Sequence, residues 1–550
     1  MDQGRLLIAI VLSILVFIVW GFFFQDKTPP VTQNPSQVSS EVASSPEKSK
    51  SGAEQASATA SGVQEQQLPA YQKSKDVVIN TPLYSVTISD SGACFKSFVL
   101  KKYKETVDPN SPDKEFIPQG MRLLNLGFSG NSIPEINTAT FLSNATAGNV
   151  DIQNKPQEIS FLWTSPSGIS VEKRFVFNPN SYLIDLNVII RNTSSTPFQD
   201  HVELSLMNKI VEGKATYGFE GSSALIDNSL EQITPKDAEK KNVYTGKIAW
   251  SSIEERYFMS AIVPSKPENA SIHLSYVKED LTSKYIEPEL RLNSGAQQTY
   301  HYNVYVGPKS YTVLSSLGVG LDRAIHFGFF DILAKPMLRL LNFLYGFFPN
   351  YGVDIIVLTL IIKAVLWPLG SKSYKSMSAM KRIQPLMAQI REKYKDDKQK
   401  MNEETMALYR TYKVNPLGGC LPMVLQIPVF FALYRMLYEA IELRHAPFLG
   451  WINDLSAPDR LFHFPFSIPF MHPPYGIPVL TIVMGATMLL QQKMSPPMGD
   501  PAQAKMMMFM PLIFTFIFIN FSSGLVLYWL VNNIVSISQQ YYIQKKFDKQ

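Results

Sequence analysis

The sequence predicts an α+β membrane protein, in which a β-rich region precedes a bundle of apolar helices. Residues 69–310 contain short runs of alternating apolar residues separated by Gly, Asn, Pro and Ser, as is typical of strands and turns. Beyond residue 310 the chain is strongly apolar, and several stretches approach the length of about 20 residues that spans a bilayer. The net charge of +5 is modest, and the basic residues are concentrated in one segment, residues 371–413.

The N-terminal stretch Leu6–Phe24 is a 19-residue apolar run that follows Arg5. The bulky residues before Gln25 offer no cleavage motif of small residues, so residues 1–27 are expected to form an uncleaved transmembrane signal anchor. Residues 28–68 are rich in Ser, Ala, Gln and Pro and lack apolar periodicity, which predicts a flexible linker.

An all-β sandwich of about 240 residues is expected over residues 69–310. Its sequence contains no phosphate-binding loop, metal-ligand cluster or nucleophile motif, and its histidines are scattered. Cys94 and Cys420 lie in different regions, which indicates neither a disulfide framework nor a metal centre. The clearest strands are predicted at Tyr84–Ile88, Ile159–Trp163, Val171–Phe177, Tyr182–Ile190 and Val202–Leu206.

Residues 311–349 are apolar but carry Asp331, Lys335 and Arg339 at four-residue steps. One charged face opposite Phe, Leu and Ile predicts an amphipathic helix that lies in the membrane interface. A helix packed on a soluble domain is the alternative.

Five further membrane spans follow, and with the N-terminal anchor they make six transmembrane helices. Prolines 368, 416, 422, 428 and 511 imply bends or ends in these helices. The loops on one side carry sixteen Lys and Arg residues, whereas those on the other side carry two. This asymmetry places the basic loops and both termini in the cytoplasm and exports the β domain. The five spans are expected at 352–369, 417–438, 475–492, 506–520 and 524–542.

The span Tyr351–Leu369, YGVDIIVLTLIIKAVLWPL, carries one cation, Lys363. A charge at the centre of a lipid-facing helix costs roughly 2.5 to 3.5 kcal/mol, so it is kept where it faces protein or water. Lys363 therefore predicts a hydrated cavity, unless its side chain only snorkels to the interface. Thr359 and Trp367 share its stripe, and Trp367 could offer a cation–π face. The only acidic residue in the five spans is Asp354, on the opposite face, which argues against ion-coupled transport.

Residues 371–413 have apolar positions at helical spacing on both sides of the polar turn Lys395–Lys400, which predicts a helical hairpin. The segment contains eleven basic and five acidic residues. This charge suits anionic lipid headgroups or RNA, and a solvated face that obeys the positive-inside rule explains it equally well. The methionine-rich stripe of the hairpin could hold varied apolar clients, because methionine repacks easily.

Four long segments resemble, in the same order, those of the YidC/Oxa/Alb family of membrane protein insertases, in its Gram-negative form with a large periplasmic domain. The resemblance extends over the whole chain in architecture and is strongest from about 340 to 545. The segments are YKVNPLGGCLPMVLQIPVFFALY at 412–434, ELRHAPFLGWINDLSAPD at 442–459, QQKMSPPMGDPAQAKMMMFMP at 491–511 and SSGLVLYWLVNN at 522–533.

This resemblance implies an insertase and chaperone of the bacterial inner membrane, without enzymatic chemistry, cofactor or metal. Its five-helix insertase core, here residues 350–550, would form a hydrophilic groove that is open to the cytoplasm and to lipid. The β domain would be the family's periplasmic β-supersandwich. The implied partners are nascent membrane proteins, the Sec translocon, the ribosome, a targeting receptor and membrane lipids.

The resemblance also implies roles for individual residues. The substrate groove would contain Lys363, Thr359, Gln426, Asn532 and Ser536, and the apolar client helix would slide along Tyr528 and Trp529. Contact with clients or ribosomes in the cytoplasm would fall to Met380, Met387, Lys381, Arg382 and Asp500.

The chain departs from the family pattern in two places. The family usually has arginine at the position of Lys363, and a lysine cannot supply the planar fork of a guanidinium. The chain ends at KKFDKQ, without the long basic tail of some relatives, so ribosome contact is expected to depend on the two cytoplasmic loops.

Two other classes of function compete with this interpretation. A small-solute transporter or channel would use Lys363 as its binding site. A membrane-anchored periplasmic carbohydrate enzyme or receptor would use the β domain. Neither class explains the cytoplasmic hairpin.

Overall fold

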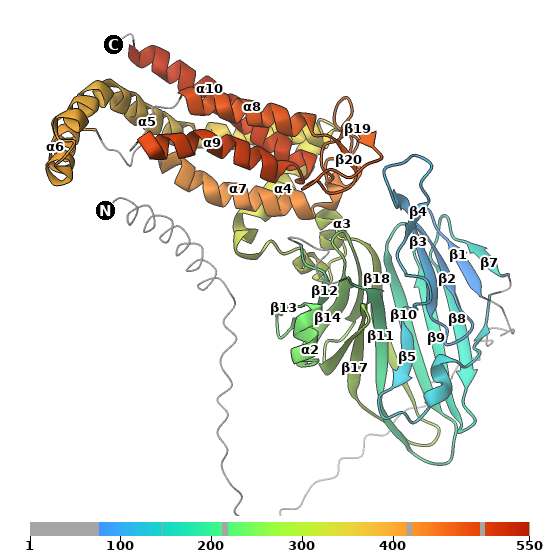
Figure 1. Ribbon diagram of the computed structural model, residues 1–550. Coiled ribbons are helices and arrows are strands. Elements are labelled where there is room, and N and C mark those ends of the chain that lie inside the picture. The colour runs from blue at the N-terminus through green and yellow to red at the C-terminus, as the bar shows by residue number, and fades with distance from the viewer. Residues whose placement is uncertain (1–75, 146, 212–217, 415–420, 495–500, 549–550) are drawn as a thin grey trace, which may run out of the picture. The chain divides into compact units, whose positions relative to one another are not determined.

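The computed structural model describes residues 76–145, 147–211, 218–414, 421–494 and 501–548, which belong to one compact unit, Ala70–Gln550. A β-rich part, blue to green in Figure 1, is followed along the chain by a helical part, yellow to red. The anchor and linker expected over residues 1–68 lie outside the described residues, and so does Asp500.

The β-rich part contains a small sheet whose strands show the alternating burial expected of a half-covered surface. Its strands pair antiparallel except at one edge, where β1 and β7 are parallel. The order across this sheet is β4 (Asp113–Glu115), β3 (Phe95–Lys104), β2 (Tyr84–Ile88), β1 (Val77–Asn80) and β7 (Asn149–Asp151).

The second sheet is larger, and its path runs through eleven strands with β12 (Gly221–Ile226) and β13 (Ser229–Ile233) attached beside β14. A short helix, α2 (Pro235–Lys240), follows β13 and is capped by Thr234. The order along the path is β5 (Asn125–Phe128), β11 (Phe198–Lys209), β17 (Asp280–Leu292), β16 (Asn269–Val277), β14 (Val243–Glu254), β15 (Phe258–Pro264), β18 (Gln297–Pro308), β10 (Leu183–Asn192), β9 (Ile169–Phe177), β8 (Gln157–Thr164) and β6 (Leu142–Ser143).

The two sheets pack against each other through aromatic side chains. Phe95 of β3 contacts Phe175 of β9 with ring centroids 5.3 Å apart, and both rings are fully buried. The five strands predicted from sequence are confirmed: Tyr84–Ile88 coincides with β2, and the others fall on β8 to β11. Alternation with period 2 identified them because one face of each strand enters this apolar layer.

A lysine lies buried between the sheets, where pattern reasoning expects an apolar residue. Lys173 of β9 has no exposed surface, and its Nζ donates to the carbonyl oxygens of Gly92, Ala93 and Leu124 at 3.0, 2.9 and 2.9 Å. Burial lowers the pKa of Lys173 to about 8. The three acceptors match the three donors of an ammonium group, so this side chain ties β9 to two loops.

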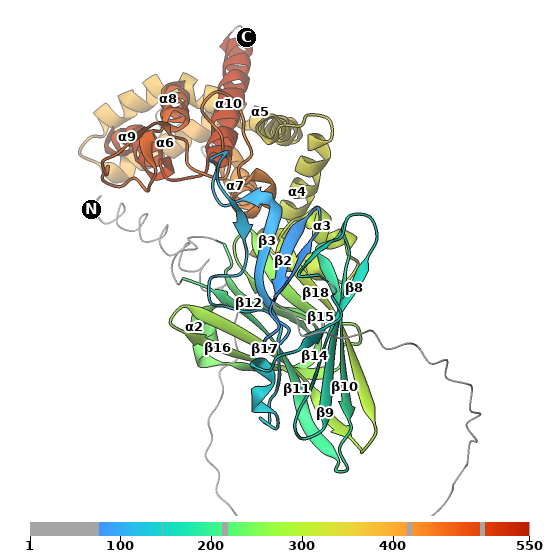
Figure 2. The same cartoon turned by 90° about the vertical axis from the view of Figure 1, so that its right-hand side faces the viewer.

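The single amphipathic helix expected over residues 311–349 is wrong in extent. The chain forms α3 (Tyr311–Ser316), two 3₁₀ turns and then α4 (Asp331–Tyr345). Gly318, Gly320 and Gly328 have φ of 69°, 76° and 64°, a left-handed conformation that ends a helix. Figure 2 shows this path from the end of β18 through α3 to α4.

The remaining helices differ from the predicted spans mainly at their ends. The span expected to end at Leu369 continues as one 43-residue helix, because neither Pro368 nor Pro385 ends it. Residues 475–477 form β20, paired with β19 (Leu461–Phe464), so the span predicted from 475 begins as a helix only at Val479. The helices are α5 (Tyr351–Lys393), α6 (Lys398–Thr411), α7 (Leu421–Glu439), α8 (Val479–Met494), α9 (Pro501–Phe518) and α10 (Ser523–Asp548), and β20 is Tyr475–Ile477.

Among the described residues, α5 is the one helix both long and apolar enough to cross a membrane. Only 28% of its apolar window is buried, which is low for the core helix of a soluble protein. A shorter apolar run, Met508–Phe518, lies within α9. In Figure 1 the hairpin of α5 and α6 extends from the end of the helices opposite β19 and β20.

Helices α8 and α9 approach closely at a glycine. A Cβ on Gly485 would overlap Oγ1 of Thr515, with Cγ2 at 3.0 Å. We expect Gly485→Ala to push the helices apart and to lower the free energy of unfolding by roughly 1 to 3 kcal/mol. Thermal unfolding in detergent measures this effect.

The matched control for this change is Ala486→Val, because Ala486 is exposed on the same helix turn. Adding Thr515→Ala to Gly485→Ala should recover part of the lost stability, since it removes the two overlapping atoms. An unchanged melting temperature in Gly485→Ala alone would contradict the close packing.

Candidate functional site

Lys363, the cation predicted to be functional, extends from α5 toward α10. The half-buried Lys363 donates from Nζ to Oγ of Ser536 at 2.8 Å, and Ser536 Oγ donates to the carbonyl oxygen of Asn532 at 2.7 Å. Within the described part of the chain, no carboxylate pairs with Lys363. The predicted partner on its own helix, Trp367, instead accepts a bond from α10 through its carbonyl oxygen.

Helix α10 carries a buried polar stripe that joins three neighbouring helices. Gln426 of α7 donates from Nε2 to Asn532 Oδ1 at 2.6 Å, and Asn533 Nδ2 donates to Thr487 Oγ1 of α8 at 3.2 Å. Gln539 Nε2 donates to the carbonyl of Trp367 at 3.1 Å, which connects α10 to α5. Polar contacts therefore converge on one side of α10 inside helices with apolar outer faces.

Four predicted groove residues come together here: Lys363, Gln426, Asn532 and Ser536. Thr359 does not join their hydrogen bonds in the described structure, because its Oγ1 donates to the carbonyl oxygen of Ile355 in its own helix at 2.6 Å. Thr359 is nevertheless buried one turn from Lys363.

Sequence reasoning overlooked Thr487, Gln539 and Gln540. The two glutamines follow Asn532 and Ser536 at steps of three to four residues, so helical periodicity could have added them to the stripe. Gln540 is 1% exposed, and neither polar atom of its side chain has a hydrogen-bond partner among the described residues. No pattern in the sequence marked Thr487 in this way, because its contact with α10 depends on how α8 packs.

The predicted aromatic pair occupies the helix interior. Tyr528 is 2% exposed, and Trp529 packs edge-on against Phe430 and Phe518, with ring centroids 4.7 and 5.1 Å apart. Helix α9 exposes a dense run of large apolar side chains on its outer face. They are Met508, Phe509, Met510, Leu512, Ile513, Phe516 and Ile517.

The predicted hairpin forms from the second half of α5 and from α6. Met380 and Met387 are 7% and 9% exposed and pack in its core, where Tyr409 Oη approaches Met387 Sδ at 3.7 Å. Their stripe therefore holds the hairpin together and presents little surface to a client. Lys381 and Arg382 lie on the exposed side of the same helix.

Asp354, in the first turn of α5, is fully buried, and its two carboxylate oxygens have no hydrogen-bond partner among the described residues. The carboxylate lies near the helix N-terminus, where the helix dipole favours negative charge. It does not pair with Lys363, as expected from its place on another face.

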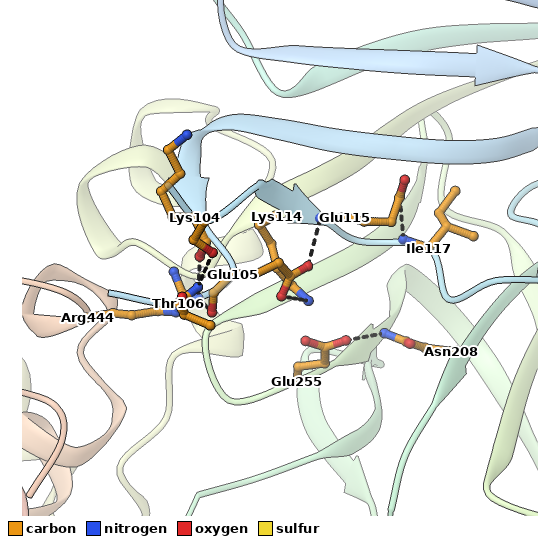
Figure 3. Close-up of polar contacts among 10 residues, drawn as sticks. Lys104, Glu105, Thr106, Lys114, Glu115, Ile117, Asn208, Glu255 and Arg444 are labelled. Carbon is orange, nitrogen blue, oxygen red and sulfur yellow. Dashed lines mark hydrogen bonds and ion pairs between the residues drawn. The ribbon is translucent and has the colours of Figure 1, made fainter. Parts of the chain in front are cut away.

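The β domain and the helices meet at the segment that follows α7. Arg444 donates from Nη2 to the carbonyl oxygens of Lys104 and Glu105 at 2.6 and 3.2 Å (Figure 3). The Glu105 carboxylate accepts from the backbone amide of Glu115 at 3.0 Å and pairs with Lys114 at 3.4 Å. The arginine thus binds the turn after β3, which the neighbouring strand holds in place.

A second arginine fixes the end of α7. Arg256 donates from Nε and Nη2 to the carbonyl oxygen of Tyr438 at 2.9 and 2.6 Å, and its guanidinium lies 3.6 Å from the centre of the Tyr438 ring. Beside it, the buried pair Lys309–Glu254 is 2.7 Å apart. The β domain therefore contacts the end of α7 through the half-buried Arg256, next to an ion pair that is buried within the domain itself.

We expect Arg256→Ala to loosen this junction. The variant loses two hydrogen bonds to one carbonyl and the stacking on Tyr438, a combined loss of roughly 2 to 4 kcal/mol at the contact. Hydrogen exchange of the amides around Tyr438 should accelerate, while amides of β9 stay protected.

Arg191→Ala is the matched control, because Arg191 lies on β10 and pairs with Glu172 inside the β domain. If Arg256→Ala leaves exchange near Tyr438 unchanged, the arginine does not hold the junction.

Two protein families match consecutive parts of the chain. Residues 76–340 match the family described as YidC periplasmic domain, and residues 343–550 match 60Kd inner membrane protein. The protein "Membrane protein insertase YidC" of Syntrophus aciditrophicus (strain SB) is 40% identical over 561 residues, 99% of this chain and 100% of the relative. The protein of the same name from Syntrophobacter fumaroxidans (strain DSM 10017 / MPOB) is 40% identical over 559 residues, which are 99% of this chain and 100% of the relative.

Among solved structures, "Active YidC insertase crystal structure with the first transmembrane domain resolved" is 19% identical, covers 86% of this chain and 93% of its own, and gives a TM-score of 0.37. The family is assigned from the sequence identity of 40%, which extends over almost the entire length of the chain. The chain belongs to the YidC family of membrane protein insertases.

Proposed function

We propose that the chain inserts proteins into the bacterial inner membrane by receiving a polar client segment at the cluster of Lys363, Gln426, Asn532 and Ser536. The observation that carries this proposal is the 2.8 Å bond from Lys363 Nζ to Ser536 Oγ. A cation on an apolar helix that is held by a neutral hydroxyl keeps its full charge available to a client. The surrounding amides can hydrogen-bond the client backbone without neutralising that charge.

The cluster acts as a hydrophilic groove, and water in it shortens the hydrocarbon barrier for the polar segment. The cation favours segments that carry acidic or carbonyl groups. The apolar helix of the client leaves along the exposed face of α9, with Trp529 beside it. This mechanism needs no bond chemistry.

The topology we propose has six spans: Leu6–Phe24, the first half of α5, α7, α8, α9 and α10. This topology divides the chain into five parts. They are the anchor (1–27), the linker (28–68), the periplasmic domain (69–310), the interfacial segment (311–349) and the insertase core (350–550). Both termini and the hairpin at 371–413 are then cytoplasmic, in accord with the positive-inside rule. Exposed apolar residues on α4, Ile332 and Phe343 at 81% and 62%, support its place in the interface.

The partners we propose on the cytoplasmic side are the ribosome and a targeting receptor. Their contacts fall to Lys381 and Arg382 on the hairpin and to the loop around Asp500. Association with the Sec translocon would extend the client range and involves no residue that we assign.

Site-specific photocrosslinking tests the groove. A photoreactive residue replaces Gln426, or Phe516 on the exposed face of α9, while ribosomes present a stalled membrane-protein chain. We expect Gln426 to crosslink the polar segment of the client and Phe516 its apolar helix. Val277, 62% exposed on the β domain, is the matched control.

Crosslinks that persist after the client's apolar helix is deleted, or none at either position, would contradict the proposal. Solute flux into proteoliposomes without any client would then favour a transporter.

A further inference from the structure

The segment between α7 and α8 carries a loop of exposed aromatic residues, which we call the aromatic loop (residues 461–477, LFHFPFSIPFMHPPYGI). It contains no Lys, Arg, Asp or Glu. Strands β19 and β20 form its base. Phe462, Phe466 and Phe470 are 66%, 60% and 79% exposed, although water disfavours such surface by about 25 cal/mol per Å². An uncharged loop that displays three phenylalanines requires an apolar environment.

The aromatic loop is anchored by a buried arginine. Arg460 is 6% exposed, and it donates from Nε to the carbonyl of Pro474 and from Nη1 to the carbonyl of Ile519, both at 2.9 Å. Asn520 Nδ2 donates to the carbonyl of Phe470 at 2.8 Å. The loop is therefore tied at both ends to the connection between α9 and α10.

The backbone of the loop is held in a strained conformation that displays the rings. Phe462 and Phe470 have φ of 54° and 64°, a region that bulky residues rarely adopt. Such a conformation costs of order 1 to 3 kcal/mol and persists only where its surroundings fix it. The exposed rings are thus already positioned, and little further ordering is needed when they meet a partner.

The loop surface continues the outer face of α9. Phe470 contacts Phe516 edge-on with ring centroids 5.7 Å apart, and Phe516 is 55% exposed beside other apolar residues of that face. Phe516 lies two residues before the end of α9, or about 3 Å along the axis. Phe470 therefore lies at the level where this apolar helix ends.

We infer that the aromatic loop is a membrane-interface anchor, with its phenylalanines at the boundary between headgroups and acyl chains. Lipid fits better than a protein partner, because the loop has no charge for a specific ion pair and its rings extend a face that already meets lipid in the proposed topology. Interfacial segments of this kind bury apolar side chains about 5 to 10 Å into that boundary.

The position of the β domain indicates which leaflet of the membrane the aromatic loop meets. Arg256 and Arg444 connect that domain to the residues that close α7, and the aromatic loop lies between α7 and α8 on the same side of the helices. The loop therefore meets the periplasmic leaflet. This inference requires the helices to be in the membrane but not the groove at Lys363, so the two can fail independently.

Depth-dependent fluorescence quenching tests the inference on the full chain in vesicles of phosphatidylethanolamine and phosphatidylglycerol. Cys94 and Cys420 are first replaced by serine, and Phe466→Cys or Phe470→Cys is then labelled with an environment-sensitive fluorophore. We expect blue-shifted emission, strong quenching by lipids that carry a spin label near the glycerol backbone, and protection from aqueous iodide. Val277→Cys, on the β domain, should show the opposite pattern.

Two results would overturn the inference. Quenching of positions 466 and 470 by iodide to the same degree as position 277 would mean that the loop stays in water. Protection from iodide without quenching by labelled lipids would mean that protein covers it. A label at Phe516→Cys reports whether α9 itself is in lipid, which separates failure of the loop from failure of the proposed membrane topology.

Discussion

Replacing Lys363 by alanine is expected to reduce insertion of clients with acidic exported segments by more than ten-fold. A carboxylate about 7 Å from the ammonium interacts with it by roughly 2 kcal/mol at an effective dielectric constant of about 20. That energy corresponds to roughly a 30-fold change in rate when it is realised at the barrier. The measurement is protease protection of the exported segment after translation into proteoliposomes.

The most discriminating measurement is the ratio of two insertion efficiencies. One is that of an acidic client, and the other is that of the same client with its Asp and Glu residues replaced by Asn and Gln. Lys363→Arg should keep this ratio, since it keeps the charge, whereas Lys363→Ala should bring it to one. Lys393→Ala is the matched control, because it removes a cation from the exposed C-terminal end of the same helix. Equal loss for both clients would leave hydration of the groove, and not its charge, as the cause.

Replacing Lys173 by methionine is expected to destabilise the β domain by roughly 3 kcal/mol or more. The change leaves the buried carbonyls of Gly92, Ala93 and Leu124 without their donor, and a buried acceptor without a partner costs about 1 to 3 kcal/mol. Urea unfolding of the full chain in detergent, followed by near-ultraviolet circular dichroism, measures the loss. Lys247→Met, at an exposed position of β14, should cost little.

Lys173 also predicts a pH dependence. Burial lowers its pKa to about 8, whereas an unfolded chain gives lysine about 10.4. Between these values the unfolded state binds more protons, so the free energy of unfolding should rise with pH, by up to about 3 kcal/mol. Below pH 8 both states carry the proton and the contribution is flat. Lys173→Met should remove this rise, and a wild-type profile that falls over the same interval would contradict it.

Local patterns in the sequence predicted the elements well. Alternation along β2 and β8 to β11 identified strands, because one face of each enters the core. The apolar runs identified α7 to α10, although their ends shifted by several residues, as where β20 precedes α8 and where α10 extends to Asp548. These elements depend on residues close together in the chain.

Features that depend on distant contacts were not predicted. Pro368 predicted a bend or an end near that position, but α5 continues through it. Neighbouring helices can satisfy the backbone group that a proline frees, and such contacts cannot be predicted from the local sequence. The bond from Lys363 to Ser536 joins residues 173 positions apart, and no periodicity within one helix gives that register. The stripe of Met380 and Met387 was predicted to contact clients, but in the structure it packs against α6.

The continuity of α5 has a mechanical consequence. Its 43 residues measure about 65 Å at 1.5 Å per residue, roughly twice the hydrocarbon thickness of a bilayer. Lys363 and the arm of the hairpin therefore belong to one rod, with no loop between them to absorb rotation. A load that tilts the arm by about 10° at the membrane surface displaces its far end by roughly 6 Å and must turn the intramembrane part as well. If a ribosome docks at the arm, as we propose above, it would exert torque directly on the site of Lys363.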